Sequence, residues 1–144
     1  MSGESLRVDT SGSGVHQLLT TSDGELLISS CVNDSTLRIW DSRTGAPRGM
    51  LKGHQGDIVQ MMLSPDGRRL ASASLDRTAR LWDLATTESR VLRGHTAPVT
   101  GAVFLDDQNL ASASWDGTVR LWLDDLPMDT EALRAWMMTV AGTQ

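Results

Sequence analysis

The sequence has little that would place the protein in a membrane, outside the cell or on a nucleic acid. It holds one cysteine, Cys31, which cannot form an intramolecular disulfide and therefore favours a reducing compartment. No apolar run is long enough to cross a bilayer, and the polar segment 1–14 lacks the apolar core of a secretory signal. A net charge of −5 gives no attraction to a nucleic-acid backbone or an anionic membrane. We therefore expect a cytoplasmic protein that binds neither nucleic acids nor membranes.

What the sequence does contain is one unit that occurs three times. The three copies are ELLISSCVNDSTLRIWD at 25–41, RRLASASLDRTARLWD at 68–83 and NLASASWDGTVRLW at 109–122. Their aspartates, Asp34, Asp76 and Asp116, lie 42 and 40 residues apart, and their tryptophans keep the same spacings. A period near 40 with four short extended stretches per unit is typical of a β-propeller, in which each repeat forms one blade.

The repeats predict an all-β chain with about three four-stranded blades. Blades are expected at about 15–52, 55–93 and 96–123, within a propeller segment that spans 1–127. The third repeat has no fourth strand, whereas residues 5–9 precede the first blade in the pattern of an outer strand. One chain would therefore carry the two parts of a split blade, one at each end.

A short helix is predicted in the C-terminal tail, 128–144. Apolar residues recur there at helical spacing, namely Leu133, Trp136, Met137 and Val140. This apolar stripe could dock on the exposed side of the third blade, or it could bind a partner protein.

A Gly-His pair precedes the corner aspartate and the tryptophan in two of the repeats. Gly53-His54 precedes Asp76 and Trp82-Asp83, and Gly94-His95 precedes Asp116 and Trp122. In these residues and their spacing the chain resembles the WD-repeat family over roughly residues 5–123. The resemblance implies a buried network in each blade that links a histidine, a serine, an aspartate and a tryptophan. The implied members are His54, Ser72, Asp76 and Trp82 in blade two, His95, Ser112, Asp116 and Trp122 in blade three, and Ser30, Asp34 and Trp40 in blade one.

Physical chemistry supports such a network, because a buried aspartate is costly unless donors fill its acceptor sites. Imidazole, hydroxyl and backbone N–H groups can supply those donors, and an indole N–H can end the network while its ring fills the core. Blade one has Ser11 where the other blades have histidine. Its network is therefore expected to be incomplete.

Serine, histidine and aspartate within one blade could also form a hydrolase triad. The same spacing recurs in two blades, however, and an active site is not normally copied with every structural unit. Convergent metal ligands and a glycine-rich phosphate loop are both missing from the sequence. We therefore expect no enzyme activity, no cofactor and no metal.

The corners of the blades and the starts of their inner strands predict a partner-binding rim. Trp115 stands beside the corner aspartate of blade three, where an exposed aromatic side chain would suit an interface and a packed one would not. The resemblance to WD-repeat proteins, whose partners often bind one rim, implies the candidate residues His16, Asn33, Asp57, Val59, Leu75, Pro98, Thr100 and Trp115.

These features together predict a non-catalytic protein–protein interaction scaffold whose partner is an unidentified protein or peptide. Three blades fall below the usual count of about 4–8, so the ring is expected to close by self-assembly. A homodimer with six blades is favoured, and a homotrimer with nine or a ring completed by another protein are alternatives. The chain could instead be a fragment or regulatory part of a larger multidomain enzyme or signalling protein.

Overall fold

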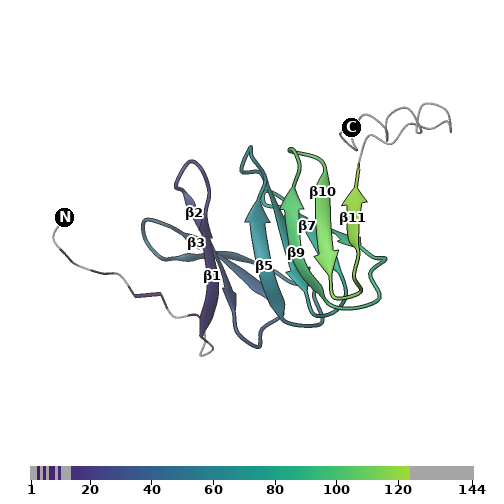
Figure 1. The fold of residues 1–144 in the computed structure, drawn as a ribbon. Coiled ribbons are helices and arrows are strands. Elements are labelled where there is room, and N and C mark those ends of the chain that lie inside the picture. Colours follow the sequence, from purple (N-terminus) through teal and green to yellow (C-terminus); the bar gives the residue numbers. More distant parts are fainter. Residues whose placement is uncertain (1–2, 4, 6, 9, 11–13, 124–144) are drawn as a thin grey trace.

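The computed structural model describes residues 3, 5, 7, 8, 10 and 14–123. They contain three antiparallel sheets, which we call blades one, two and three (Figure 1). Blade one comprises β1 (Val15–Thr20), β2 (Leu26–Cys31), β3 (Leu37–Asp41) and β4 (Pro47–Leu51). Blade two comprises β5 (Ile58–Leu63), β6 (Arg69–Ser74), β7 (Ala79–Asp83) and β8 (Ser89–Leu92). Blade three comprises β9 (Val99–Phe104), β10 (Leu110–Ser114) and β11 (Val119–Trp122).

Each blade is a meander, because short turns join strands that are neighbours in the sequence. The turn between β1 and β2 ends at Gly24, and the turn between β5 and β6 ends at Gly67; both glycines have a φ of 72°. Only glycine adopts this left-handed conformation at no steric cost. In each turn the aspartate before the glycine accepts a hydrogen bond of 2.6 Å, Asp23 from Thr21 and Asp66 from Ser64.

The hydrophobic core lies between the blades rather than within any one of them. Figure 1 shows the inner strands β1, β5 and β9 following one another across the molecule. Between blades one and two, Ile58 and Met61 of β5 pack with Ile28 and Leu37. A second cluster joins blades two and three and includes Ala71, Ala73, Val99, Ala102 and Phe104. An inner blade therefore needs a neighbour on each side to bury its surface.

The all-β prediction is confirmed for the described residues, none of which lies in a helix. None of them, accordingly, forms a helix long and apolar enough to span a membrane. The helix predicted over 128–144 lies outside the described residues. Blade three has the strand order β11-β10-β9, so β11 has no outer neighbour within the described part of the chain. Within the predicted outer strand 5–9, the described residues Ser5, Arg7 and Val8 belong to no strand of this single chain.

Candidate functional site

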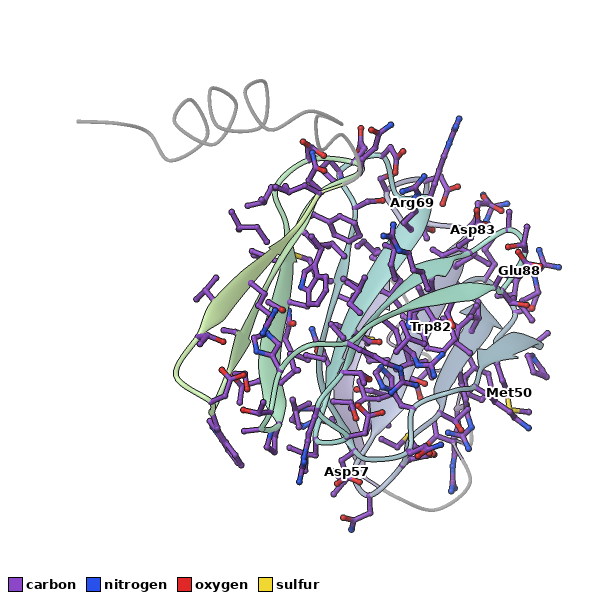
Figure 2. All side chains as sticks on the ribbon, turned by 90° about the vertical axis from the view of Figure 1, so that its right-hand side faces the viewer. Met50, Asp57, Arg69, Trp82, Asp83 and Glu88 are labelled. Carbon is purple, nitrogen blue, oxygen red and sulfur yellow. The ribbon has the colours of Figure 1, made fainter. Side chains whose placement is uncertain are left out.

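In blade two, one hydrogen-bonded network connects the loop before β5 to strands β6 and β7. His54 contacts Asp76 through Nδ1 at 2.8 Å and Ser72 through Nε2 at 2.7 Å. Trp82 donates its indole N–H to Ser72 Oγ at 2.8 Å. Figure 2 shows Trp82 among the packed side chains, with Asp57 at one end of the blade and Asp83 at the other.

The donors and acceptors of this network determine where its protons lie. A carboxylate only accepts, so His54 Nδ1 carries the proton and donates it to Asp76. His54 Nε2 is then the acceptor for the Ser72 hydroxyl, whose oxygen in turn accepts the indole N–H of Trp82. The neutral histidine therefore satisfies the aspartate, the serine and the tryptophan at once.

Blade three repeats this arrangement with nearly identical geometry. His95 contacts Asp116 through Nδ1 and Ser112 through Nε2, each at 2.8 Å, and Trp122 donates to Ser112 Oγ at 2.8 Å. The side chain of His95 is fully buried and that of Asp116 is 8% exposed. The sequence-predicted residues of blades two and three therefore come together in the structure.

A threonine in each of these networks was missed by the sequence reasoning. Thr78 donates its hydroxyl to Asp76 Oδ1 at 2.6 Å, and its backbone N–H donates to the same oxygen at 2.8 Å. Thr118 makes both contacts to Asp116 in blade three. The signal was present in the sequence, because a threonine follows two residues after every corner aspartate, including Thr36 after Asp34.

In blade one the prediction that Ser30 belongs to the network is wrong. Trp40 donates its indole N–H to Ser29 Oγ at 2.9 Å, whereas Ser30 Oγ is buried without a hydrogen-bond partner in the described part of the chain. The reason is one extra residue, Asn33, which sits between β2 and Asp34 with a φ of 56°. Counting back four residues from Asp34 reaches Ser30, whereas the strand pairing aligns Ser29 with Arg38, as it aligns Ser72 with Arg80 in blade two.

Asp34 also differs from the other corner aspartates in its cationic partner. Arg38 of β3 donates Nη1 to Asp34 Oδ2 at 2.6 Å, and the two side chains are 19% and 22% exposed. Thr36 N donates to Asp34 Oδ1 at 3.0 Å, as the equivalent threonines do in the other blades. An arginine on the neighbouring strand therefore occupies the acceptor that histidine fills elsewhere.

The two complete networks and the ion pair all favour ionised aspartates. Burial raises the pKa of Asp76, but hydrogen bonds from Thr78, the Gln55 N–H and His54 outweigh it and lower the pKa to about 2. In blade three the Thr118 hydroxyl, against the opposing effect of burial, helps to hold the pKa of Asp116 far below its ordinary range. Burial also lowers the pKa of His54, although the bond to Asp76 opposes this effect.

Acid is expected to destabilise the fold in two stages. His54 has a lower pKa in the folded chain than its ordinary 6.5, so unfolding takes up a proton and stability falls as the pH drops below about 6.5. Asp76 has a folded pKa of about 2 against an ordinary 3.8, so its stabilisation is lost between about pH 4 and pH 2. Urea titrations at pH 7, 5 and 3 measure this effect, and a free energy of unfolding that rises on acidification would contradict it.

A hydrolase triad would need an accessible nucleophile, which the buried serines do not provide. Ser72 is 0% exposed and its oxygen accepts the indole N–H of Trp82. Ser112 is similarly enclosed by Trp122. Both oxygens already take part in buried hydrogen bonds, so the Ser–His–Asp connectivity fits a structural network better than acyl transfer. Among the described residues, no group of His, Cys, Asp and Glu has the arrangement of a metal site.

The predicted rim residues gather at the corner ends of the blades. Trp115 N donates to the Pro98 carbonyl at 3.1 Å, and Leu75 N donates to the Asp57 carbonyl at 2.9 Å. The backbone of each corner is therefore fixed to the start of its inner strand, while the side chain beside it stays outside. Trp115 is 72% exposed and does not pack under a loop of the described chain.

Blade one requires one correction at this rim. Val32 N donates to the Gly14 carbonyl at 2.8 Å, so Val32 rather than Asn33 is the counterpart of Leu75 and Trp115. The extra residue Asn33 shifted this prediction as it shifted the prediction for Ser30. His16 lies nearby and donates Nε2 to the Val59 carbonyl at 3.0 Å, which links blade one to blade two.

Comparison with known families agrees with this geometry. The model of the family WD40, described as "WD domain, G-beta repeat", matches residues 3–41, 45–83 and 86–122, which together make up most of the chain. In each match the first residue lies 12 or 13 residues before an inner strand, at Val15, Ile58 and Val99.

Curated relatives align with parts of the chain and are themselves much longer. A nuclear distribution protein PAC1 of Arthroderma otae is 44% identical over 77 residues, which are 51% of this chain and 16% of that protein. Coronin-7 of Mus musculus is 42% identical over 40% of this chain and 6% of that protein. The solved structure of U3-55K has a TM-score of 0.73 at 22% identity and covers 81% of this chain and 38% of that one, so this likeness concerns the fold.

Proposed function

Because the chain belongs to the WD40 repeat family, we propose that it is a non-catalytic protein-interaction scaffold that closes its propeller by self-assembly. The observation that carries this proposal is the pair of buried networks, in which the histidines and serines form hydrogen bonds that hold the blade corners rigid. The exposed rim is then the surface left for binding. The cytoplasm remains the expected location, because the composition and the single cysteine favour it.

The rim suits an unidentified protein or peptide with apolar side chains. Trp115 is 72% exposed and Leu75 is 39% exposed, and both stand on corners that backbone hydrogen bonds hold in place. Large aromatic side chains on rigid supports are common anchors at protein interfaces. The polar members of the rim, among them Asp57 and Thr100, give such a partner hydrogen-bonding groups.

The Trp115→Ala substitution is expected to weaken peptide binding at least about ten-fold, because it removes the largest exposed apolar side chain of the rim. The measurement starts from a displayed peptide library selected on the wild-type chain and compares the affinities of the selected peptides by calorimetry. Leu105→Ala is the matched control, since Leu105 is 51% exposed and follows the opposite end of β9. Equal affinities for wild-type and Trp115→Ala would show that the rim anchor is wrong.

Self-assembly is supported by the small number of blades and by the missing outer strand of blade three. Propellers usually have about 4–8 blades, and β11 lacks an outer neighbour in the described part of the chain. The second and third matched ranges begin at residues 45 and 86, just before the outer strands β4 and β8. The first begins at residue 3, just before the predicted outer strand 5–9. We propose that residues 5–9 of one copy pair with β11 of the next, which gives six blades in a homodimer or nine in a homotrimer.

A second candidate has the ring completed by blades outside this sequence, either from another protein or from a longer chain. The observation that favours it is the length of the relatives, since the aligned segment is 16% of the PAC1 protein and 6% of coronin-7. In that case the chain would be part of a larger multidomain enzyme or signalling protein. A stable complex with a different protein, formed by a chain that stays monomeric alone, would favour this candidate.

A further inference from the structure

Two glutamines join neighbouring blades through the backbone of the following inner strand. Gln17 of β1 accepts from Met61 N at 2.9 Å and donates to the Met61 carbonyl at 2.9 Å. Gln60 of β5 accepts from Ala102 N at 2.7 Å. Each glutamine reaches from one blade to the next. The joint between blades one and two and the joint between blades two and three therefore contain the same kind of polar contact.

Blade three has no glutamine at this position. Gly101 pairs with Ala113 as Gln60 pairs with Ala73, so Gly101 is the counterpart of the two glutamines. The face of blade three that carries Gly101 points away from blade two, and we call it the open face of blade three. A hollow of about 230 Å³ lies on it. Its lining is mostly apolar and consists of Gly101, Val103, Ala111, Ser112, Ala113 and Val119.

The opposite end of the array carries an exposed leucine. Leu18 pairs with Ser29 as Met61 pairs with Ser72 and as Ala102 pairs with Ser112, so the three residues are equivalent. Met61 and Ala102 are each 1% exposed, whereas Leu18 is 54% exposed. Figure 1 shows β1 and β11 at opposite sides of the three blades.

The geometry of the two joints within the chain predicts which residues would meet in a third joint, formed by blade three of one copy and blade one of another. Met61 and Ala102 are the residues that face the glutamines. A further joint of the same kind therefore places Leu18 of one copy opposite Gly101 of another. The missing glutamine leaves room for a branched apolar side chain, and both open surfaces are apolar at this point.

We propose that the open face of blade three binds the open face of blade one of a second copy, with Leu18 of that copy in the hollow beside Gly101. This proposal rests on the self-assembly proposed above and names its contact. The occupant is a second copy because the matching surface lies at the other end of the same chain, and identical head-to-tail contacts can close a ring. Without a glutamine, this joint depends on apolar burial.

The first test replaces Leu18 with aspartate. Sedimentation of Leu18→Asp is expected to show a dissociation constant raised at least about 100-fold, because the joint would bury an unpaired charge. Ala85→Asp is the matched control, since Ala85 is exposed but lies in the turn between β7 and β8 of blade two, away from both open faces. Circular dichroism checks that each variant stays folded.

The second test is a rescue by opposite charge. Gly101→Lys alone is expected to weaken assembly, and Leu18→Asp combined with Gly101→Lys to recover at least about ten-fold in affinity over Leu18→Asp, since the charges would pair across the joint. The single chain can accept the lysine, because an added Cβ at Gly101 meets no atom within 4 Å.

Each outcome decides for or against this contact. Three results would overturn the Leu18–Gly101 contact but leave self-assembly standing: Leu18→Asp leaves assembly intact, Ala85→Asp weakens it equally, or the double variant fails to recover it. A wild-type chain that is monomeric at every concentration overturns both. Loss in Leu18→Asp with recovery in the double variant supports the contact.

Discussion

The Asp76→Ala substitution is expected to lower the free energy of unfolding by roughly 2–4 kcal/mol, the cost of breaking a buried polar network. Asp76 accepts from His54, Thr78 and the Gln55 N–H, and its side chain is 11% exposed. Alanine would leave the buried His54 Nδ1–H without its carboxylate acceptor and with only the Thr78 hydroxyl oxygen, 3.3 Å away. Guanidinium titrations of the wild-type and variant chains at pH 7 measure the difference.

The matched control for this substitution is Asp34→Ala in blade one. Asp34 is 22% exposed and pairs with Arg38, which can turn to solvent when the carboxylate is removed. A partly exposed ion pair contributes less than a buried network, so the loss in Asp34→Ala should be clearly smaller. Equal losses in the two variants would show that the buried histidine network adds no more stability than the ion pair of blade one.

Removing residues 1–10 is expected to abolish assembly, because the deletion takes away the strand proposed to complete blade three of the next copy. The edge of β11 would then keep its backbone donors and acceptors unpaired at the joint. Light scattering over a range of concentrations measures this loss. The matched control replaces residues 1–10 with a glycine–serine segment of equal length, which should also fail to assemble; a truncated chain that assembles like the wild type would rule out the shared strand.

The repeat pattern was enough to predict the strands, the meanders, and the histidine, serine, aspartate and tryptophan of the networks in blades two and three. Regular spacing made this possible, because Asp76 and Asp116 stand at the same distance from their serines and tryptophans. The same counting failed in blade one, where Asn33 adds a residue between Ser29 and Asp34. Ser29 stands two residues after Leu27, the strand partner of Trp40, as Ser72 stands two residues after Leu70, the strand partner of Trp82. Counting from this pairing, rather than back from the aspartate through the turn, would have found Ser29.

Other features depended on contacts between blades, which a repeat pattern does not show. Gln17, Gln60 and Gly101 occupy one position in three aligned strands, yet their meaning emerges only when the glutamines are seen to bond the next blade. The exposure of Trp115 likewise depends on which loops surround it. Tertiary packing, rather than local sequence, decides both.

The most direct test of the central claim is the mass of the full chain in solution. Light scattering at several concentrations should give one species at twice the chain mass of 15.6 kDa, as expected for a six-bladed homodimer. A single species at three times that mass would keep the shared strand and replace six blades with nine. A stable, monodisperse monomer at every concentration would contradict closure of the propeller by self-assembly.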